Sequence, residues 1–79
     1  MVERQITLYY REGCHLCEEM EDALQDMCEE FHFSVDRIDI DQNEVLKKKY
    51  NADVPVAMYQ NKLLFRHFFN EQLFRDAFG

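Results

Sequence analysis

"QITLYYREGCHLCEEM", residues 5–20, contains a strand-like segment, then a glycine, then two cysteines separated by two residues. Residues 5–10 alternate apolar with polar or aromatic side chains, which predicts a β-strand. Gly13 interrupts that pattern directly before Cys14. Apolar residues at spacings of three and four then predict an amphipathic helix, whose inner stripe is formed by Cys17, Met20, Leu24, Met27, Cys28 and Phe31. A strand followed by a helix that begins at a Cys-x-x-Cys pair is therefore the starting point of the fold.

The segment after this helix predicts a second strand and a short helix. Residues 31–41, "FHFSVDRIDID", are strand-like, but the alternation slips between Val35 and Ile38, so we expect a bulge or a late start of the strand. Asp41 followed by Glu44 resembles a capping box, with Asp41 as the capping residue. The short helix that follows is expected to bury Val45, Leu46 and Tyr50.

The last third of the chain predicts a hairpin and a final helix. The expected strands cover residues 55–59 and 63–67, with a turn around Asn61. Asn70 is expected to cap the final helix, whose inward-facing residues are predicted to be Leu73, Phe74, Ala77 and Phe78. The order β-α-β-α-β-β-α favours two parallel strands joined by a right-handed crossover, with the hairpin adding two antiparallel strands. The sequence therefore predicts an α/β fold, a four-stranded mixed sheet flanked by three helices, as one domain over residues 1–79.

Size and charge narrow the class of protein. A chain of 79 residues buries only about 60% of its unfolded surface, so its core is thin. The net charge of −7, from 9 basic and 16 acidic residues, repels nucleic acid and anionic membrane surfaces. The sequence contains no apolar run of the roughly 18 residues that span a bilayer, and no signal peptide is expected. Three cysteines, an odd number, are ordinary in a reducing compartment. We expect a cytoplasmic monomer.

The Cys-x-x-Cys spacing assigns a role to each cysteine. Cys14 falls at the first turn of the helix, where unpaired backbone N–H groups and the helix dipole favour a thiolate and lower the thiol pKa. A thiolate is the attacking form in disulfide exchange. Cys17 lies one turn further on, close enough to attack a mixed disulfide formed at Cys14. Cys14 is thus the candidate nucleophile and Cys17 the candidate resolving thiol.

Metal binding is the alternative use of the same pair. His15 would supply a third ligand, but a closed zinc site needs four, and the sequence has no second Cys-x-x-Cys or His pair. Cys28 lies eleven helical residues beyond Cys17, roughly 16 Å along the axis at about 1.5 Å per residue, so it is expected to be a small buried apolar residue. His15 itself either faces solvent or, when protonated, stabilises the Cys14 thiolate. No metal site is therefore predicted.

With these elements in place, "LYYREGCHLC" resembles the glutaredoxin branch of the thioredoxin fold, with Tyr9 five residues and Arg11 three residues before the first cysteine. "DIDQNEVLKKKYNADVPV" is similar to the stretch that leads to the Val-Pro step of that family, here Val54-Pro55. The resemblance implies that Pro55 is cis and that the backbone of Val54 binds an extended substrate. Arg11 is expected to hold the thiolate or an anionic substrate, and Asn70 to meet a carboxylate together with the helix amides.

The resemblance also implies an activity and its partners. The main expectation is a small thiol-disulfide oxidoreductase without a bound cofactor, acting on protein disulfides or glutathione mixed disulfides, with glutathione or a separate reductase as electron donor. Two other functions stay open. One is a non-catalytic thioredoxin-fold binding module, and the other is an iron-sulfur carrier in which two protomers each lend Cys14 and glutathione supplies further thiolates.

One segment departs from the family pattern. Where glutaredoxins have a pair of glycines close to glutathione, residues 65–71 of this chain read "FRHFFNE". Phe68 and Phe69 are adjacent, so on an extended segment they point in different directions. Either one of them is exposed near the cysteines and favours an apolar protein partner, or both pack under the last helix.

Overall fold

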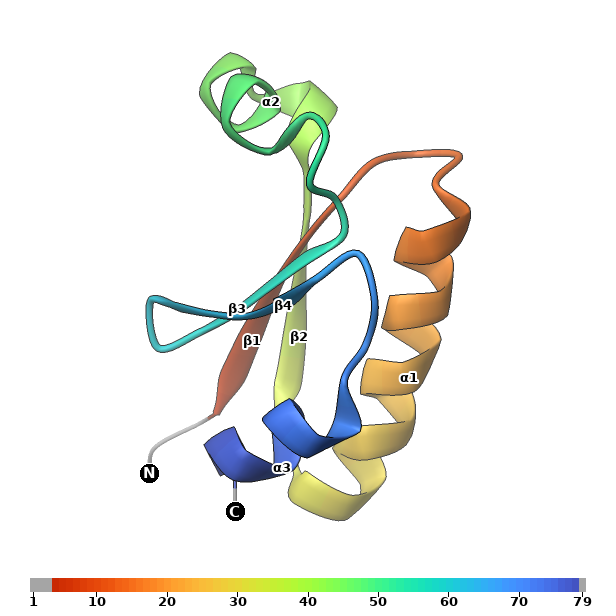
Figure 1. The fold of residues 1–79 in the computed structure, drawn as a ribbon, viewed down its shortest axis with the longest axis vertical. Helices are drawn as coiled ribbons and strands as arrows, with labels where there is room; N and C mark the ends of the chain where they lie inside the picture. Colours follow the sequence, from red (N-terminus) through yellow and green to blue (C-terminus); the bar gives the residue numbers. More distant parts are fainter. Residues whose placement is uncertain (1–3, 79) are drawn as a thin grey trace.

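The computed structural model describes residues 4–78, so residues 1–3 and 79 of the predicted domain lie outside the described residues. The predicted order of elements is confirmed, with one additional 3-10 turn, η1 (Figure 1). The elements are β1 (Gln5–Tyr10), α1 (His15–Phe31), β2 (Ser34–Asp39), η1 (Ile40–Gln42), α2 (Glu44–Tyr50), β3 (Val56–Tyr59), β4 (Lys62–Arg66) and α3 (Glu71–Phe78). None of the helices within residues 4–78 is long and apolar enough to cross a membrane.

The sheet is mixed, as predicted, with the strand order β2-β1-β3-β4. β1 and β2 are parallel in an unbroken register from Gln5 opposite Ser34 to Tyr10 opposite Asp39. β2 includes both Val35 and Ile38 without a bulge, so neither a bulge nor a late start explains the slip; the two residues lie on opposite faces of the strand. β3 runs antiparallel to both β1 and β4, and the irregularity in the sheet lies between β3 and β4, at Ala57/Met58.

The hydrophobic core lies between one face of the sheet and the two longer helices. Figure 1 shows α1 running along the sheet, α3 at one end of it and α2 at the other. Ile6 and Leu8 point to the core face of β1 because side chains alternate along a strand, and both are fully buried. The buried cluster consists of Ile6, Leu8, Met20, Leu24, Ala57, Phe65, Phe74 and Phe78. β1 therefore holds α1 and α3 in one core.

Aromatic rings join α3 to the rest of this core. Phe74 stacks on Phe78 with ring centroids 4.5 Å apart. It also contacts Phe31 at the end of α1, at 5.2 Å, and Phe33 just before β2, at 5.3 Å. Such pairs contribute about 0.5–1.5 kcal/mol beyond the area that they bury. Several aromatic rings thus hold α3, a helix of only eight residues, against the core.

An ion-pair cluster on the surface adds to this junction. Arg75 of α3 donates from Nη1 to Oε2 of Glu30 in α1 at 2.6 Å, and from Nε to Oε2 of Glu71 at 2.8 Å. The hydrogen bond from Arg75 lowers the pKa of Glu30. Because the groups are exposed, we assign the cluster a minor share of the stability compared with the rings beneath it.

Two details of the predicted α2 are wrong. Asn43, and not Asp41, caps α2, since its Oδ1 accepts the N–H groups of Val45 at 2.9 Å and Leu46 at 3.1 Å. Asp41 lies in η1 instead. α2 also buries less than expected, because Val45 is 73% exposed and Leu46 and Tyr50 are only half-buried. The physical reason is length: a helix of seven residues makes barely two turns, and it packs mainly on η1 at the end of the sheet.

Two predicted core residues of α3 and one of α1 are also placed differently. Leu73 is 45% exposed and Ala77 is exposed, whereas Phe74 and Phe78 are buried. Residues four apart lie on one stripe of a helix, and the neighbouring position is turned away by about 100°. The rings of Phe74 and Phe78 occupy the narrow face of α3 that contacts the core, so Leu73 and Ala77 lie outside this contact. Cys28 is half-buried, not buried, because it lies at the edge of the α1 stripe.

We expect Phe74→Ala to lower the free energy of unfolding by about 3–5 kcal/mol, because it empties a fully buried ring site. Leu73→Ala, on the same helix but exposed, is the matched control and is expected to change it by about 0.5 kcal/mol or less. Urea unfolding followed by circular dichroism measures both. Equal losses in the two variants would contradict the orientation of α3.

Candidate active site

Cys14 and Cys17 lie together at the start of α1. Cys14 is the N-cap residue with extended backbone angles, φ −94° and ψ 109°, and its Sγ accepts the backbone N–H of Cys17 at 3.1 Å. The Cα atoms are 5.2 Å apart and the two sulfur atoms are within disulfide-bonding distance. Cys17 is 3% exposed, whereas Cys14 is half-buried. The first cysteine is therefore the accessible one, and the second lies beneath it.

Gly13 makes this placement possible. Its φ of +75° lies in the left-handed region, which side chains rarely adopt. An added Cβ would meet no atom within 4 Å, so the requirement for glycine is conformational and does not come from crowding. The turn at Gly13 redirects the chain from the end of β1 into α1, with Cys14 as the first residue of the new direction.

His15 and Cys28, the two other candidate metal ligands, do not join the Cys14–Cys17 pair in a metal site. The His15 side chain is 83% exposed, with ring nitrogens 4.0 Å from Glu18 and 3.9 Å from Glu19, so it faces solvent. Cys28 is free, and its burial raises the pKa of the thiol, partly offset by a hydrogen bond from the Phe33 backbone. Within residues 4–78, no group of three or more His, Cys, Asp or Glu side chains is arranged to hold a metal ion.

The Val54-Pro55 peptide bond is cis, as the resemblance implied. Pro55 is buried directly before β3, and its carbonyl accepts the N–H of His67 at 2.8 Å. This bond joins the Val54-Pro55 step to the turn between β4 and α3. Within residues 4–78, the backbone of Val54 makes no hydrogen bond to another protein group. Its N–H and C=O are thus free for a ligand.

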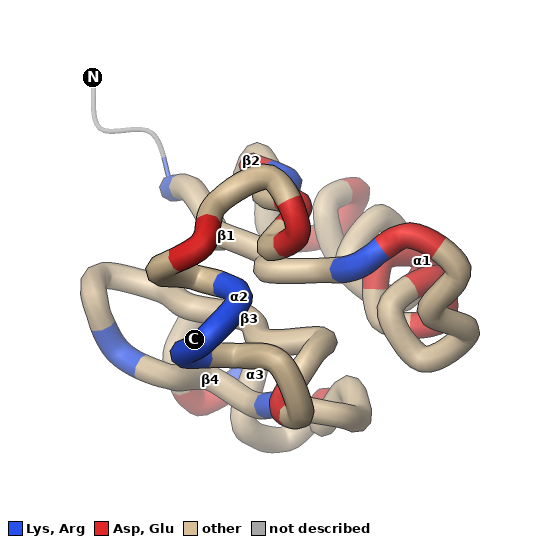
Figure 2. The backbone as a smooth tube through the Cα atoms, turned by 90° about the horizontal axis from the view of Figure 1, so that it is seen from above, with Lys and Arg blue, Asp and Glu red and all other residues tan. Residues whose placement is uncertain are grey.

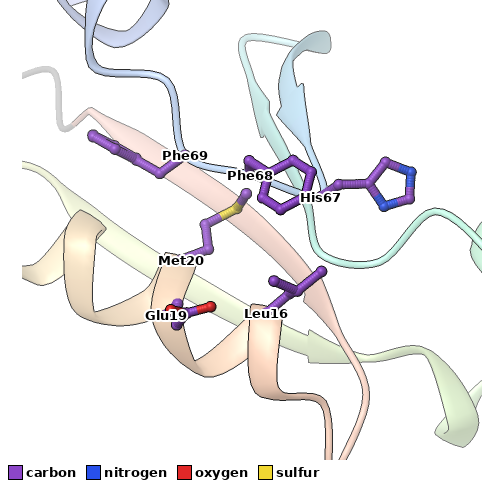
Figure 3. A pocket seen from close by; sticks show the side chains of 6 residues that line it. All are labelled: Leu16, Glu19, Met20, His67, Phe68 and Phe69. Carbon is purple, nitrogen blue, oxygen red and sulfur yellow. The ribbon is translucent and has the colours of Figure 1, made fainter.

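The turn of residues 67–69 faces the first turns of α1 across a small pocket (Figure 3). Leu16 and Met20 point from α1 toward this turn. Phe68 is 67% exposed, whereas Phe69 is half-buried and packs against Phe65 with ring centroids 5.3 Å apart. Of the two arrangements left open for the phenylalanine pair, the one with an exposed ring is therefore confirmed. The pocket is lined by Leu16, Glu19, Met20, His67, Phe68 and Phe69.

The Arg11 side chain forms hydrogen bonds to residues of η1 and of the segment just after α2. Its Nε donates to Oδ2 of Asp41 at 3.0 Å, and its Nη2 donates to Oδ1 of Asp41 at 3.0 Å and to Oδ1 of Asn51 at 2.7 Å. Tyr9 stacks on Tyr50 beside it, with centroids 4.6 Å apart. These contacts tie the end of β1 to η1 and α2. The predicted substrate-binding role of Arg11 stays a prediction.

Asp41 and Asn51 are the site residues that sequence reasoning missed. They are 30 and 40 positions from Arg11, so no local pattern connects them to it. The sequence signal for Asp41 is a polar residue before the predicted short helix, which by itself indicates a helix cap, and no local signal distinguishes Asn51. The pairing depends on the parallel register of β1 and β2, which brings the two segments to the same end of the sheet.

Asn70 caps α3, as predicted. Its Oδ1 accepts the N–H of Leu73 at 3.0 Å and its carbonyl accepts the N–H of Phe74 at 3.1 Å. The side-chain oxygen is therefore occupied by the helix. Whether Asn70 also meets a substrate carboxylate stays a prediction.

Charge is distributed unevenly around the site. Figure 2, which views the molecule from the end that carries α2 and the start of α1, shows acidic residues along α1 and basic residues on α2. The basic residues of α2 are Lys47, Lys48 and Lys49 in its last turn. α1 is thus strongly acidic, whereas positive charge is concentrated in the last turn of α2.

Comparisons with known proteins agree with this arrangement. Residues 5–78 match the family described as "Glutaredoxin-like domain (DUF836)". A protein of Dictyostelium discoideum named "Glutaredoxin-like protein YDR286C homolog" is 33% identical over 72 residues, which cover 84% of this chain and 67% of that protein.

Solved structures show the same fold. The solution NMR structure of protein Ne2328 from Nitrosomonas europaea is 34% identical, with a TM-score of 0.89 over 100% of this chain and 95% of that one. A thioredoxin from Halobacterium salinarum, 21% identical, has a TM-score of 0.63 over 96% of this chain and 72% of its own, which is a likeness of fold alone. The chain therefore belongs to the glutaredoxin-like family and has the thioredoxin fold.

Proposed function

We propose that this protein is a thiol-disulfide oxidoreductase that reduces disulfides with the Cys14–Cys17 pair. The observation that carries the proposal is the position of the Cys14 sulfur at the N-cap of α1, 3.1 Å from the backbone N–H of Cys17. Unpaired N–H groups and the helix dipole favour negative charge at that point. The family membership and the second sulfur within disulfide-bonding distance support the same chemistry.

Exposure and burial suggest the order of the two steps. In the reduced protein, the Cys14 thiolate attacks one sulfur of the substrate disulfide, forming a mixed disulfide and releasing the first substrate thiolate, which takes a proton from water. Cys17 then loses its proton and attacks Sγ of Cys14, which forms the intramolecular disulfide and releases the second substrate thiol. Two electrons pass from the cysteine pair to the substrate. Because Cys17 is 3% exposed, a substrate meets Cys14 first.

The Val54-Pro55 step is proposed to hold the substrate backbone. The free N–H and C=O of Val54 suit an extended substrate segment that pairs with the chain directly before β3, and Pro55 has no N–H to compete. The proposed substrates are protein disulfides or glutathione mixed disulfides. Glutathione or a protein reductase returns the electrons, and turnover coupled to glutathione reductase or to thioredoxin reductase identifies which.

Arg11 is proposed to act by positioning. Its fork on Asp41 and Asn51 holds the start of the segment that leads from α2 to Pro55. A planar guanidinium makes these parallel bonds, whereas an ammonium cannot. Arg11 thus supports the Val54-Pro55 step through η1 and α2.

We expect Cys17→Ser to accumulate a covalent adduct with a peptide disulfide, because the mixed disulfide at Cys14 can no longer be resolved. Intact-mass spectrometry detects the adduct. Cys14→Ser is expected to form none and to lower the rate of disulfide reduction roughly 100-fold or more, since the remaining thiols are buried or half-buried. Cys28→Ser is the matched control and should keep the rate. A Cys14→Ser protein that reduces disulfides normally would refute the proposed mechanism, and a folded wild type that binds disulfide peptides without reducing them would indicate a binding module.

For Arg11, the comparison of Arg11→Lys with Arg11→Ala separates charge from geometry. If the fork positions the Val54-Pro55 step, both variants should raise KM for a peptide disulfide by a similar factor of roughly three to ten, because neither restores the bonds to Asp41 and Asn51. Steady-state kinetics at several peptide concentrations measure it. Recovery of the wild-type KM in Arg11→Lys would instead assign Arg11 to the binding of an anionic group.

Cys14 and Cys28 are expected to react with an alkylating reagent at different pH. The helix N-terminus favours the Cys14 thiolate, so reduced Cys14 should react with iodoacetamide at neutral pH. Burial raises the pKa of Cys28, so its alkylation should require higher pH. Peptide mapping by mass spectrometry of the Cys17→Ser protein gives both rates. Identical pH profiles for Cys14 and Cys28 would contradict the expected activation of Cys14.

A further inference from the structure

The pocket beside the cysteine pair is large enough for one side chain. It lies between α1 and the turn of residues 67–69, with Leu16 from between the two cysteines in its wall (Figure 3). Its volume is about 190 Å³. An apolar cavity of about 150 Å³ holds a benzene ring, whereas pockets that enclose most of a drug-sized ligand measure about 300–1,000 Å³. The pocket therefore suits a single aliphatic or aromatic side chain, and not a whole tripeptide.

Backbone hydrogen bonds hold the turn of residues 67–69, which forms one wall of the pocket. The N–H of His67 donates to the Pro55 carbonyl at 2.8 Å, and the N–H of Phe68 donates to the Arg66 carbonyl at 2.7 Å. Phe69 packs inward on Phe65. These contacts leave Phe68 pointing outward, where it is 67% exposed. A large exposed ring that shares a pocket with Leu16, the residue before Cys17, is a surface for a partner to cover.

The charge at the pocket selects between ligands. Glu19 is the one acidic residue among the six that line it, none of the six is Lys or Arg, and the Glu19 side chain is 62% exposed. The preceding residue, Glu18, is an acidic residue in the first turn of α1, and Figure 2 shows further acidic residues along this helix. Glutathione carries more carboxylates than amines at neutral pH, so this side of the site repels it. A lysine or arginine near the pocket would be attracted.

Resting on the proposed function, we propose that the pocket binds an aromatic or aliphatic side chain that neighbours the disulfide cysteine of a protein substrate, with Glu19 facing a lysine or arginine of the same segment. The site then acts on protein disulfides with apolar and basic flanks in preference to glutathione disulfide. The redox step is unchanged: the cysteine pair becomes a disulfide and the protein substrate becomes a dithiol.

Single-turnover kinetics with the full, reduced chain test this preference. The probes are two symmetric peptide disulfides, with the sequences Lys-Phe-Cys-Phe-Lys and Glu-Ala-Cys-Ala-Glu, together with glutathione disulfide and the neutral bis(2-hydroxyethyl) disulfide. Symmetric flanks remove the need to know the direction in which the peptide binds. Each rate is divided by the rate of the same probe with dithiothreitol, which corrects for the intrinsic reactivity of its sulfur.

We expect the Lys-Phe peptide to react at least about tenfold faster than the Glu-Ala peptide and glutathione disulfide after this correction. Phe68→Ala should lower the rate with the Lys-Phe peptide roughly tenfold more than the rate with bis(2-hydroxyethyl) disulfide, because the peptide loses apolar contact. Glu19→Gln should lower it by a smaller factor that disappears at high salt. Leu63→Ala and Glu29→Gln, exposed positions on β4 and at the far end of α1, are matched controls expected to leave all rates unchanged.

The outcomes are distinguishable. If glutathione disulfide reacts as fast as the Lys-Phe peptide, or if Phe68→Ala slows every probe by the same factor, the proposed preference is overturned while the oxidoreductase activity stands. If none of the four probes reacts, the proposed function itself fails and the preference fails with it. Circular dichroism of each variant confirms that the comparison is made between folded proteins.

Discussion

Burial of one stripe of α1 against β1 determines where the cysteine pair lies. Cys17, Met20 and Leu24 are each almost fully buried, and their spacing of three and four places them on a single line of the helix. Cys14 is one turn before that line begins, so it falls at the N-cap, where it is half-buried and its sulfur accepts the backbone N–H of Cys17. The burial of this one stripe of α1 thus leaves Cys14 accessible and Cys17 buried.

The second half of the chain supplies the opposite wall of the site. The hydrogen bond from the His67 N–H to the Pro55 carbonyl connects two loops that are separated by a whole hairpin, and the later loop, residues 67–69, faces the start of α1. Rings beneath the turn, led by Phe69 and Phe74, anchor it to the core. In a domain this small, aromatic contacts hold the turn while one ring, Phe68, is left for a ligand.

Charge adds direction to this apolar site. Figure 2 shows acidic residues along α1 and basic residues on α2, so a partner with separated charges would be oriented by both elements. Arg11 contributes little to that field as a free charge, because Asp41 and Asn51 already accept its hydrogen bonds. These hydrogen bonds instead connect the end of β1 to the segment before Pro55.

Local patterns in the sequence were sufficient for the order of the elements, the cap at Asn70 and the Cys14–Cys17 pair, because each depends on periodicity or on neighbours within one helical turn. The mixed sheet then followed from the order of the elements and the preferred right-handed crossover. The cap of α2, the exposure of Leu73 and the partners of Arg11 depended on tertiary structure. α2 and α3 are short, so contacts with the rest of the domain, and not their own apolar pattern, decide which residues are buried. Asp41 and Asn51 meet Arg11 only after the parallel pairing of β1 and β2 has brought distant segments to one end of the sheet. The same is true of the pocket at Phe68, whose two walls come from opposite ends of the chain.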